Sequence, residues 1–141
     1  MQYAIISYAS RLQNLASDFI LSELVRRGIS DLAPCHGDIL ASLFNGAEGC
    51  TLSELAGLTN RTKSTVSVLV DKLIASGYVV KTVGRTDTRT VQISLTDKGK
   101  SLRHVFEEIS SAMNEKLLDG FKTYEAQALE DMLRRCVANF K

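Results

Sequence analysis

Residues 51–99 read TLSELAGLTNRTKSTVSVLVDKLIASGYVVKTVGRTDTRTVQISLTDKG, and the order of local patterns in this stretch decides the fold. The run TLSE at 51–54 is a capping box, in which a hydroxyl and a carboxylate bind the first amides of a short helix ending near Leu58. Thr62 is placed to cap a second helix, which runs to about Ser76 and stops at Gly77. Two helices joined by so short a turn predict a helix-turn-helix.

A two-stranded hairpin is predicted directly after the second helix. Residues 78–83 favour one strand, and residues 91–95 alternate apolar with polar side chains, as a half-buried strand does. The connecting loop places Arg85 and Arg89 on either side of Asp87. An arginine on a narrow loop suits the minor groove of DNA, and Asp87 would orient it by a charge-assisted hydrogen bond. The alternative is a weakly stabilising surface salt bridge at a turn.

The helix at 62–76 has one apolar face, formed by Val66, Leu69, Val70, Leu73 and Ile74. Its opposite face carries small hydroxyls and lysines, which would let the helix enter the ~12 Å major groove. The amides at its start favour a phosphate, and Val68 is placed to touch a thymine methyl. The alternative is an ordinary solvated helix face. The candidate DNA contacts here are Arg61, Thr62, Lys63, Ser64, Thr65, Ser67, Val68 and Lys72, with Lys72 nearer the backbone.

Positive charge is concentrated in this part of a nearly neutral chain. The 141 residues carry a net charge of +1, but residues 61–89 hold six basic and two acidic side chains, or +4, which leaves −3 for the rest. This distribution favours a polyanionic partner at this segment.

The overall composition is that of one globular module. Apolar residues make up 45% of the chain and charged residues 23%, and no run approaches the ~20 apolar residues that cross a bilayer. We see no signal peptide pattern, and three scattered cysteines fit a reducing compartment better than a disulfide framework. We therefore predict a cytoplasmic protein with no membrane partner.

Further helices are predicted on both sides of the central stretch. One covers residues 3–27, with apolar residues spaced as a packing seam, and another runs from Pro34 to about residue 45. Thr96 is expected to cap a long helix that ends at Gly120. A last amphipathic helix covers 124–140. The residues of this helix that are expected to face inward are Leu129, Met132, Leu133, Cys136 and Val137. Cys136 is expected to be a core residue.

These terminal helices expose more apolar surface than a small winged domain can cover, which predicts a homodimer. Pairing across a two-fold axis would present two recognition helices to a pseudo-palindromic site, with half-sites about one helical turn, or ~10 base pairs, apart. The residues predicted to form the dimer interface are Ile5, Tyr8, Leu12, Leu129, Leu133 and Phe140.

The central stretch resembles the DNA-binding domain of the MarR (multiple antibiotic resistance regulator) family of bacterial transcription factors. The resemblance lies in Leu55-Ala56, Ser64-Thr65-Val66-Ser67, Leu69-Val70-Asp71-Lys72-Leu73, Gly77-Tyr78-Val79, Asp87 with Arg89, and Leu95-Thr96-Asp97-Lys98-Gly99. The helices on both sides match those of the family in order and length, so the resemblance covers nearly the whole chain. It implies a mainly α protomer of six helices with a β-hairpin wing, and an obligate dimer. The chain would be one module of residues 1–141, with a winged part at 34–99 and dimerisation helices at 1–30 and 100–141.

One position departs from the family pattern. Arg61 stands in the turn where many members have an apolar residue. It is either an additional phosphate contact or a side chain whose stem packs over the turn with its head group in water.

Family members often respond to a small ligand held between the winged part and the dimer helices, or to cysteine oxidation. His36 is the candidate effector-binding residue, and Cys35 at a helix start is the candidate redox sensor. Two such residues do not make a metal site. We expect no cofactor.

The predicted function is a ligand-responsive repressor that binds a double-stranded DNA operator as a homodimer, with a small-molecule effector as a further partner. An enzyme is not expected, since the chain has two histidines, no glycine-rich phosphate loop and no usefully spaced pair of acids. The alternatives are a redox-responsive regulator acting through Cys35 and a winged-helix protein-interaction module without DNA binding.

Overall fold

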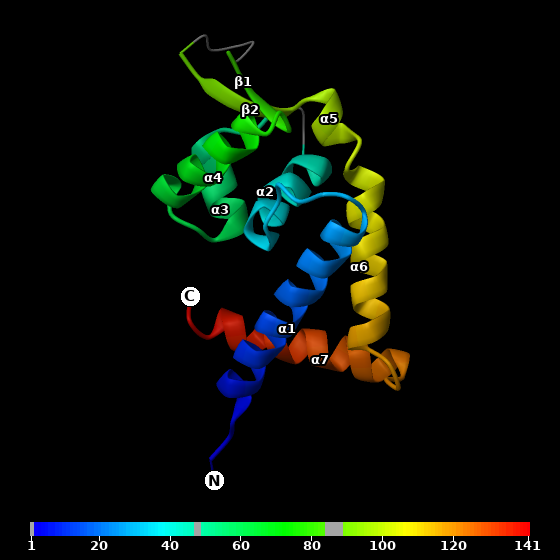
Figure 1. The fold of residues 1–141 in the computed structure, drawn as a ribbon. Helices are drawn as coiled ribbons and strands as arrows, with labels where there is room; N and C mark the ends of the chain where they lie inside the picture. Colours follow the sequence, from blue (N-terminus) through cyan, green and yellow to red (C-terminus); the bar gives the residue numbers. More distant parts are fainter. Residues whose placement is uncertain (1, 47–48, 84–88) are drawn as a thin grey trace. The chain divides into compact units, whose positions relative to one another are not determined.

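The computed structural model describes residues 2–46, 49–83 and 89–141 (Figure 1). Its elements are α1 (Ile5–Arg26), α2 (Pro34–Asn45), α3 (Leu52–Thr59), α4 (Lys63–Ala75), β1 (Val79–Val83), β2 (Val91–Leu95), α5 (Asp97–Lys100), α6 (Arg103–Leu117) and α7 (Thr123–Ala138). The predicted fold class, mainly α with one small hairpin, is confirmed. The chain forms two compact units, Met1–Ile109 and Ser110–Lys141.

The first unit has one apolar core, built mainly from α2, α3, α4 and the hairpin, which lie together in Figure 1. Leu24 of α1 and Ile109 of α6 are buried in the same core. Side chains from each of these elements are fully buried, among them Leu40, Leu55, Val66 and Ile93 at 0% exposure. Burial of this kind stabilises a fold by roughly 1.5–3 kcal/mol for each large apolar side chain. The core therefore holds α3 and α4 in a fixed mutual arrangement.

The predicted helix caps are confirmed. The Thr51 hydroxyl accepts from the Glu54 amide at 3.1 Å, and the Thr51 amide donates back to the Glu54 carboxylate at 3.4 Å. The Thr62 hydroxyl accepts from the Thr65 amide at 3.3 Å. After α4, Gly77 has φ +82°, a left-handed conformation that glycine adopts without strain, and this turns the chain into β1.

The wing is an antiparallel hairpin in which Val79 pairs with Leu95 and Val83 with Val91. A further bridge joins Cys50 to Ile93, with backbone hydrogen bonds of 3.0 and 2.7 Å in the two directions. The segment before α3 thus adds a short third edge to the hairpin. The sequence did not predict this edge, because a single bridge leaves no repeating pattern.

The prediction of a single helix from Thr96 to Gly120 is wrong, because the structure has two helices in this segment. Thr96 does cap a helix, but α5 ends after four residues and α6 begins at Arg103. Between them the Leu102 amide bonds to the Gly99 carbonyl at 3.1 Å, a tighter turn than an α-helix makes. Gly99 packs against the backbone of Tyr78 and Leu102 is buried in the core, so the chain bends here. The described residues therefore form seven helices, where the resemblance implies six.

The apolar face of α7 is not buried within the second unit. The expectation that Cys136 is a core residue is wrong, because Cys136 is exposed, as are Met132, Leu133 and Val137. The second unit contains only α7 and the end of α6, and such a unit is too small to bury both faces of a helix.

The seam on α1 is exposed in the same way, with Ile5 at 52%, Tyr8 at 68% and Leu12 at 42% exposure.

Among the residues that the structure describes, no helix combines the length and hydropathy needed to cross a membrane.

Candidate nucleic-acid interface

The two faces of α4 are sharply different. Val66, Val70 and Leu73 are buried in the core, whereas Val68 is 59% exposed on the other side. The predicted contacts that lie exposed on this open face or at its start are Thr62, Lys63, Ser64, Thr65, Val68 and Lys72. Ser67 and Arg61 are half-buried. The structure therefore brings most of the predicted α4 residues onto one solvent-facing surface.

Hydroxyl groups are linked at the start of α4. The Thr62 hydroxyl lies 2.9 Å from the Thr65 hydroxyl and 3.2 Å from that of Ser64. Linked hydroxyls have fewer orientations, so they present donors and acceptors in a restricted geometry. They lie at the positive end of the helix dipole, and Lys63 adds a full charge beside them. This group of side chains has the chemistry to hold a phosphate or the edge of a base.

The wing is joined to α4 by an ion pair. The ammonium of Lys81 on β1 lies 3.7 Å from a carboxylate oxygen of Asp71, with both side chains largely exposed. An exposed pair of this kind contributes only about 0.2–1 kcal/mol. It also neutralises the one acidic side chain on the open face of α4.

Of the three predicted wing-tip residues, Arg85 and Asp87 lie outside the described residues. Arg89 is described and is exposed just before β2. The predicted alignment of Arg89 by Asp87 remains a prediction.

The end of α4 is held by a polar cluster that the sequence did not predict. The Tyr78 hydroxyl donates to the Asp31 carboxylate at 2.7 Å, and the Lys98 ammonium lies 4.4 Å from the centre of the Tyr78 ring. Lys98 also donates to the Ser76 carbonyl at 2.7 Å. Burial, together with the bond to Asp31, raises the pKa of Tyr78 to about 12, so the phenol remains protonated.

His36 is a buried helix-capping residue. Its Nδ1 accepts from the Ala33 amide at 2.9 Å, so the neutral ring carries its proton on Nε2. Within the described part of the chain, that buried Nε2 has no hydrogen-bond partner. Burial lowers the pKa of His36, the charge of Lys72 lowers it further, and Asp31 opposes these effects. The side chain is 7% exposed, and its predicted role in effector binding remains a prediction.

The winged part of the chain is similar to known proteins in sequence. The sequence model of the MarR family matches residues 28–90. The HTH-type transcriptional regulator SarZ of Staphylococcus epidermidis is 32% identical over 77 residues, which cover 55% of this chain and 52% of SarZ. The winged part of the chain, residues 28–90, is thus similar to the MarR family of transcriptional regulators. The chain spans about half the length of the curated relatives it matches.

Solved structures share the MarR-family fold over almost the whole chain. CouR from Rhodococcus jostii RHA1 bound to p-coumaroyl-CoA is 25% identical with a TM-score of 0.79, covering 92% of this chain and 89% of CouR. MepR of S. aureus in complex with DNA is 24% identical with a TM-score of 0.84, covering 99% and 98%. SarZ is a transcriptional regulator, which agrees with the prediction that the chain is not an enzyme.

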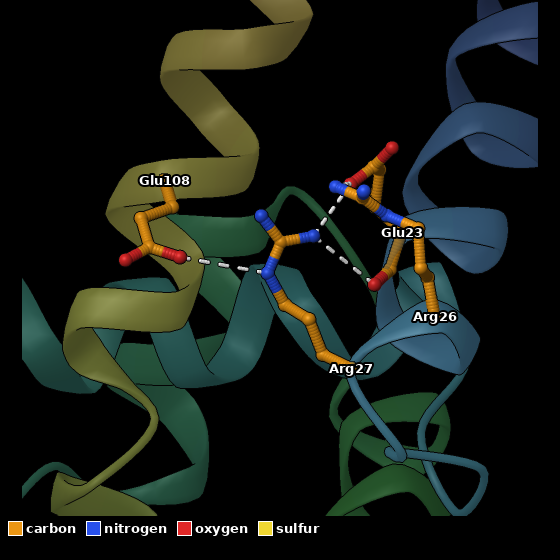
Figure 2. A network of polar contacts seen from close by, with 4 residues as sticks. All are labelled: Glu23, Arg26, Arg27 and Glu108. Carbon is orange, nitrogen blue, oxygen red and sulfur yellow. Dashed lines mark hydrogen bonds and ion pairs between the residues drawn. The ribbon is translucent and has the colours of Figure 1, made fainter.

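A second charged network lies where α1 ends (Figure 2). The Arg27 guanidinium bonds to Glu23 one turn earlier and lies 3.5 Å from the carboxylate of Glu108 on α6. Arg26 also bonds to Glu23, at 2.9 Å. The bonds from Arg27 and Arg26 hold the pKa of Glu23 below its usual value, and the bond from Arg27 has the larger effect. The network joins the last turn of α1 to α6.

Another arginine, Arg103, joins α6 to α2. Its guanidinium donates to the Phe44 carbonyl at 2.6 Å and lies 5.5 Å from the centre of the Phe44 ring. Sequence reasoning missed the contact of Arg27 with Glu108 and that of Arg103 with Phe44, because these partners are distant in sequence and follow no periodic pattern.

The lowered pKa of His36 predicts a pH dependence of stability. A histidine in the unfolded chain titrates near pH 6.5, so below that pH the unfolded chain binds a proton that folded His36 resists. The free energy of unfolding should therefore decline as the pH falls from about 7.5 through 6.5 towards the lower pKa of the folded state. Glutamine in His36→Gln keeps an acceptor for the Ala33 amide but does not titrate. The free energy of unfolding of this variant should therefore decline less as the pH falls.

Urea unfolding of both proteins at a series of pH values measures this difference. His104→Gln is the matched control, since it removes an exposed histidine. Equal pH profiles for His36→Gln and the parent would exclude His36 as the titrating group.

Proposed function

We propose that this protein is a MarR-family, sequence-specific regulator of transcription that binds double-stranded DNA through α4 and the wing. The observation that carries the proposal is the open face of α4, where hydroxyls and a lysine gather at the helix start and Val68 stands exposed. This face has the donors, acceptors and methyl groups that read the major groove. The MepR structure with DNA supports the same use of the fold.

The residues that we propose to contact DNA are Thr62, Lys63, Ser64, Thr65, Ser67, Val68, Lys72 and Arg89, together with Arg85 and Asp87 outside the described residues. The winged part at 34–99 would carry this surface. The flanks at 1–30 and 100–141 would form the dimer.

The homodimer proposal rests on the exposed apolar side chains of α1 and α7. Ile5, Tyr8 and Leu12 are exposed on α1, and Leu133 and Phe140 are exposed in or just after α7 at 44% and 90%. Leu129 is half-buried. Apolar rows on two terminal helices are a surface that association buries, and a two-fold dimer would present two copies of α4 to a pseudo-palindromic operator.

Repression in the cytoplasm, relieved by a small organic effector, is the regulatory mode that we propose. CouR bound to p-coumaroyl-CoA shows a MarR-family fold of this kind holding such a molecule. A redox response through the half-buried Cys35 is the alternative regulatory mode. A protein-interaction module without DNA binding is the alternative function.

Selection of bound duplexes from random DNA, followed by affinity measurements over a range of salt concentrations, tests the proposal. Lys63→Ala should reduce the slope of log K against log salt by about 0.9, the value for one neutralised phosphate. Val68→Ala should instead change the preferred base at one position and leave the slope unchanged.

Lys141→Ala, which removes the same charge from the second unit, is the control and should alter neither quantity. Failure to enrich any sequence would favour the protein-interaction module. A uniform loss of affinity in Val68→Ala across all sequences would exclude base contact by Val68.

A further inference from the structure

Arg61 lies in the turn between α3 and α4, directly before Thr62, the N-cap of α4. Its backbone is fixed, because its amide donates to the Ala56 carbonyl at 3.0 Å and the preceding Asn60 has a left-handed φ of 53°. Any displacement of Arg61 therefore displaces the first turn of α4. That turn carries the hydroxyls proposed to contact DNA.

The side chain of Arg61 extends from this turn to α2. One terminal nitrogen donates to the Cys35 carbonyl at 3.1 Å, and the other lies 2.9 Å from the Asp38 carboxylate. Cys35 and Asp38 are three residues apart on a helix and therefore share one face. A planar guanidinium holds two such acceptors in fixed directions, which a lysine ammonium cannot do.

The pairing also changes what Arg61 offers to DNA. Its charge is compensated by Asp38 at close range, and its side chain is 28% exposed while that of Asp38 is 58% exposed. A phosphate near this pair would experience little net attraction. The geometry thus fits neither of the roles expected from the sequence, since the head group is bound to α2 instead of lying in water.

We propose that Arg61 is a positioning residue that sets the start of α4 against the first turn of α2, with Asp38 as its partner. The inference rests on the proposed DNA-binding function. It assigns a role to the departure from the family pattern: Arg61 aligns α4 through its contacts with Asp38 and the Cys35 carbonyl.

Asp38→Asn gives opposite results under the two roles. If Arg61 bound a phosphate, removing the competing carboxylate would tighten binding to operator and random DNA alike. If Arg61 positions α4, the operator affinity falls by about tenfold although the protein has become more positive. Affinity for random DNA does not fall, so the ratio of the two affinities decreases. Asp119→Asn, which removes the same charge from the second unit, is the control and leaves the ratio unchanged.

Arg61 variants supply a second comparison. Arg61→Gln lowers operator affinity without reducing the salt slope, whereas loss of a phosphate contact would reduce the slope by about 0.9. Arg61→Lys keeps the charge but not the two-acceptor geometry, so it recovers only part of the affinity. In the double variant Arg61→Gln/Asp38→Asn the losses are less than additive, because both changes remove one interaction.

Amide hydrogen exchange at Thr65 and Val66 measures the position of α4 without DNA. Both amides bond to Thr62, and Asp38→Asn accelerates their exchange relative to Asp119→Asn. If the parent binds no selected duplex, the proposed function fails, and accelerated exchange still supports the contact between α2 and α4. Tighter operator binding by Asp38→Asn, or unchanged exchange, overturns the positioning role.

Discussion

Leu12→Asp is expected to convert the proposed dimer into a monomer and to weaken operator binding by at least about 100-fold. Leu12 lies in the exposed row of α1 with Ile5 and Tyr8, and it is 42% exposed in the single chain. A carboxylate buried there without a partner would lose its hydration, at a cost of several kcal/mol per charge, and a two-fold axis places two such charges in one interface. A monomer would present one α4 to DNA in place of two, and losing the second contact removes an advantage of roughly 10²–10⁴.

Sedimentation equilibrium at micromolar protein and operator titration measure the two effects. Gln13→Asp is the matched control, because it introduces the same charge at the neighbouring exposed position, which points about 100° away around the helix. Far-ultraviolet circular dichroism of both variants verifies that α1 remains folded. A dimer in Leu12→Asp as stable as in the parent would show that the interface uses another surface.

The sequence predicted correctly those features that depend on residues a few positions apart in the chain. The caps at Thr51, Thr62 and Thr96 each join residues three positions apart, so the pattern that predicts them is the interaction itself. The buried face of α4 followed from its period in the same way. Both kinds of inference need only the local geometry of a helix.

Predictions failed where distant segments meet. The break between α5 and α6 depends on Gly99 approaching Tyr78, 21 residues earlier in the chain. The family resemblance marks Arg61 as a departure but does not indicate Asp38 as its partner on α2. The sequence likewise does not indicate that Tyr78 contacts Asp31. The amphipathic pattern of its helix predicts a core position for Cys136, but a second chain can equally cover an apolar face. Periodicity identifies the face and not what covers it.

The histidine at position 36 is an intermediate case. Its place at the third position of α2, after an N-cap alanine that has no acceptor of its own, is a local pattern that sequence reasoning could have used. The cap that the His36 Nδ1 provides for the Ala33 amide accounts for a histidine at this position without a bound ligand.

Gly99→Ala is expected to lower the free energy of unfolding by about 3 kcal/mol. A β-carbon at this position would lie 2.1 Å from the Tyr78 carbonyl oxygen and 3.1 Å from a methyl of Leu95, and the first of these is backbone that cannot rotate away. The same carbonyl accepts from the Thr96 amide at 3.0 Å, so relief of the clash would break the hydrogen bond that joins the start of β1 to the start of α5. Overpacking costs about 1–3 kcal/mol, and the lost buried bond adds to it.

Gly57→Ala is the matched control for this change. A β-carbon at Gly57 would meet nothing within 4 Å, and the residue lies inside α3, where alanine is preferred to glycine by about 1 kcal/mol. The same chemical change should therefore stabilise the protein at one glycine and destabilise it at the other. Urea unfolding at one fixed protein concentration measures both, since association would make stability depend on concentration. If Gly99→Ala unfolds with the same midpoint and slope as the parent, α5 does not pack closely on the end of α4 and the start of β1. The short helix would then have no part in fixing where α4 ends.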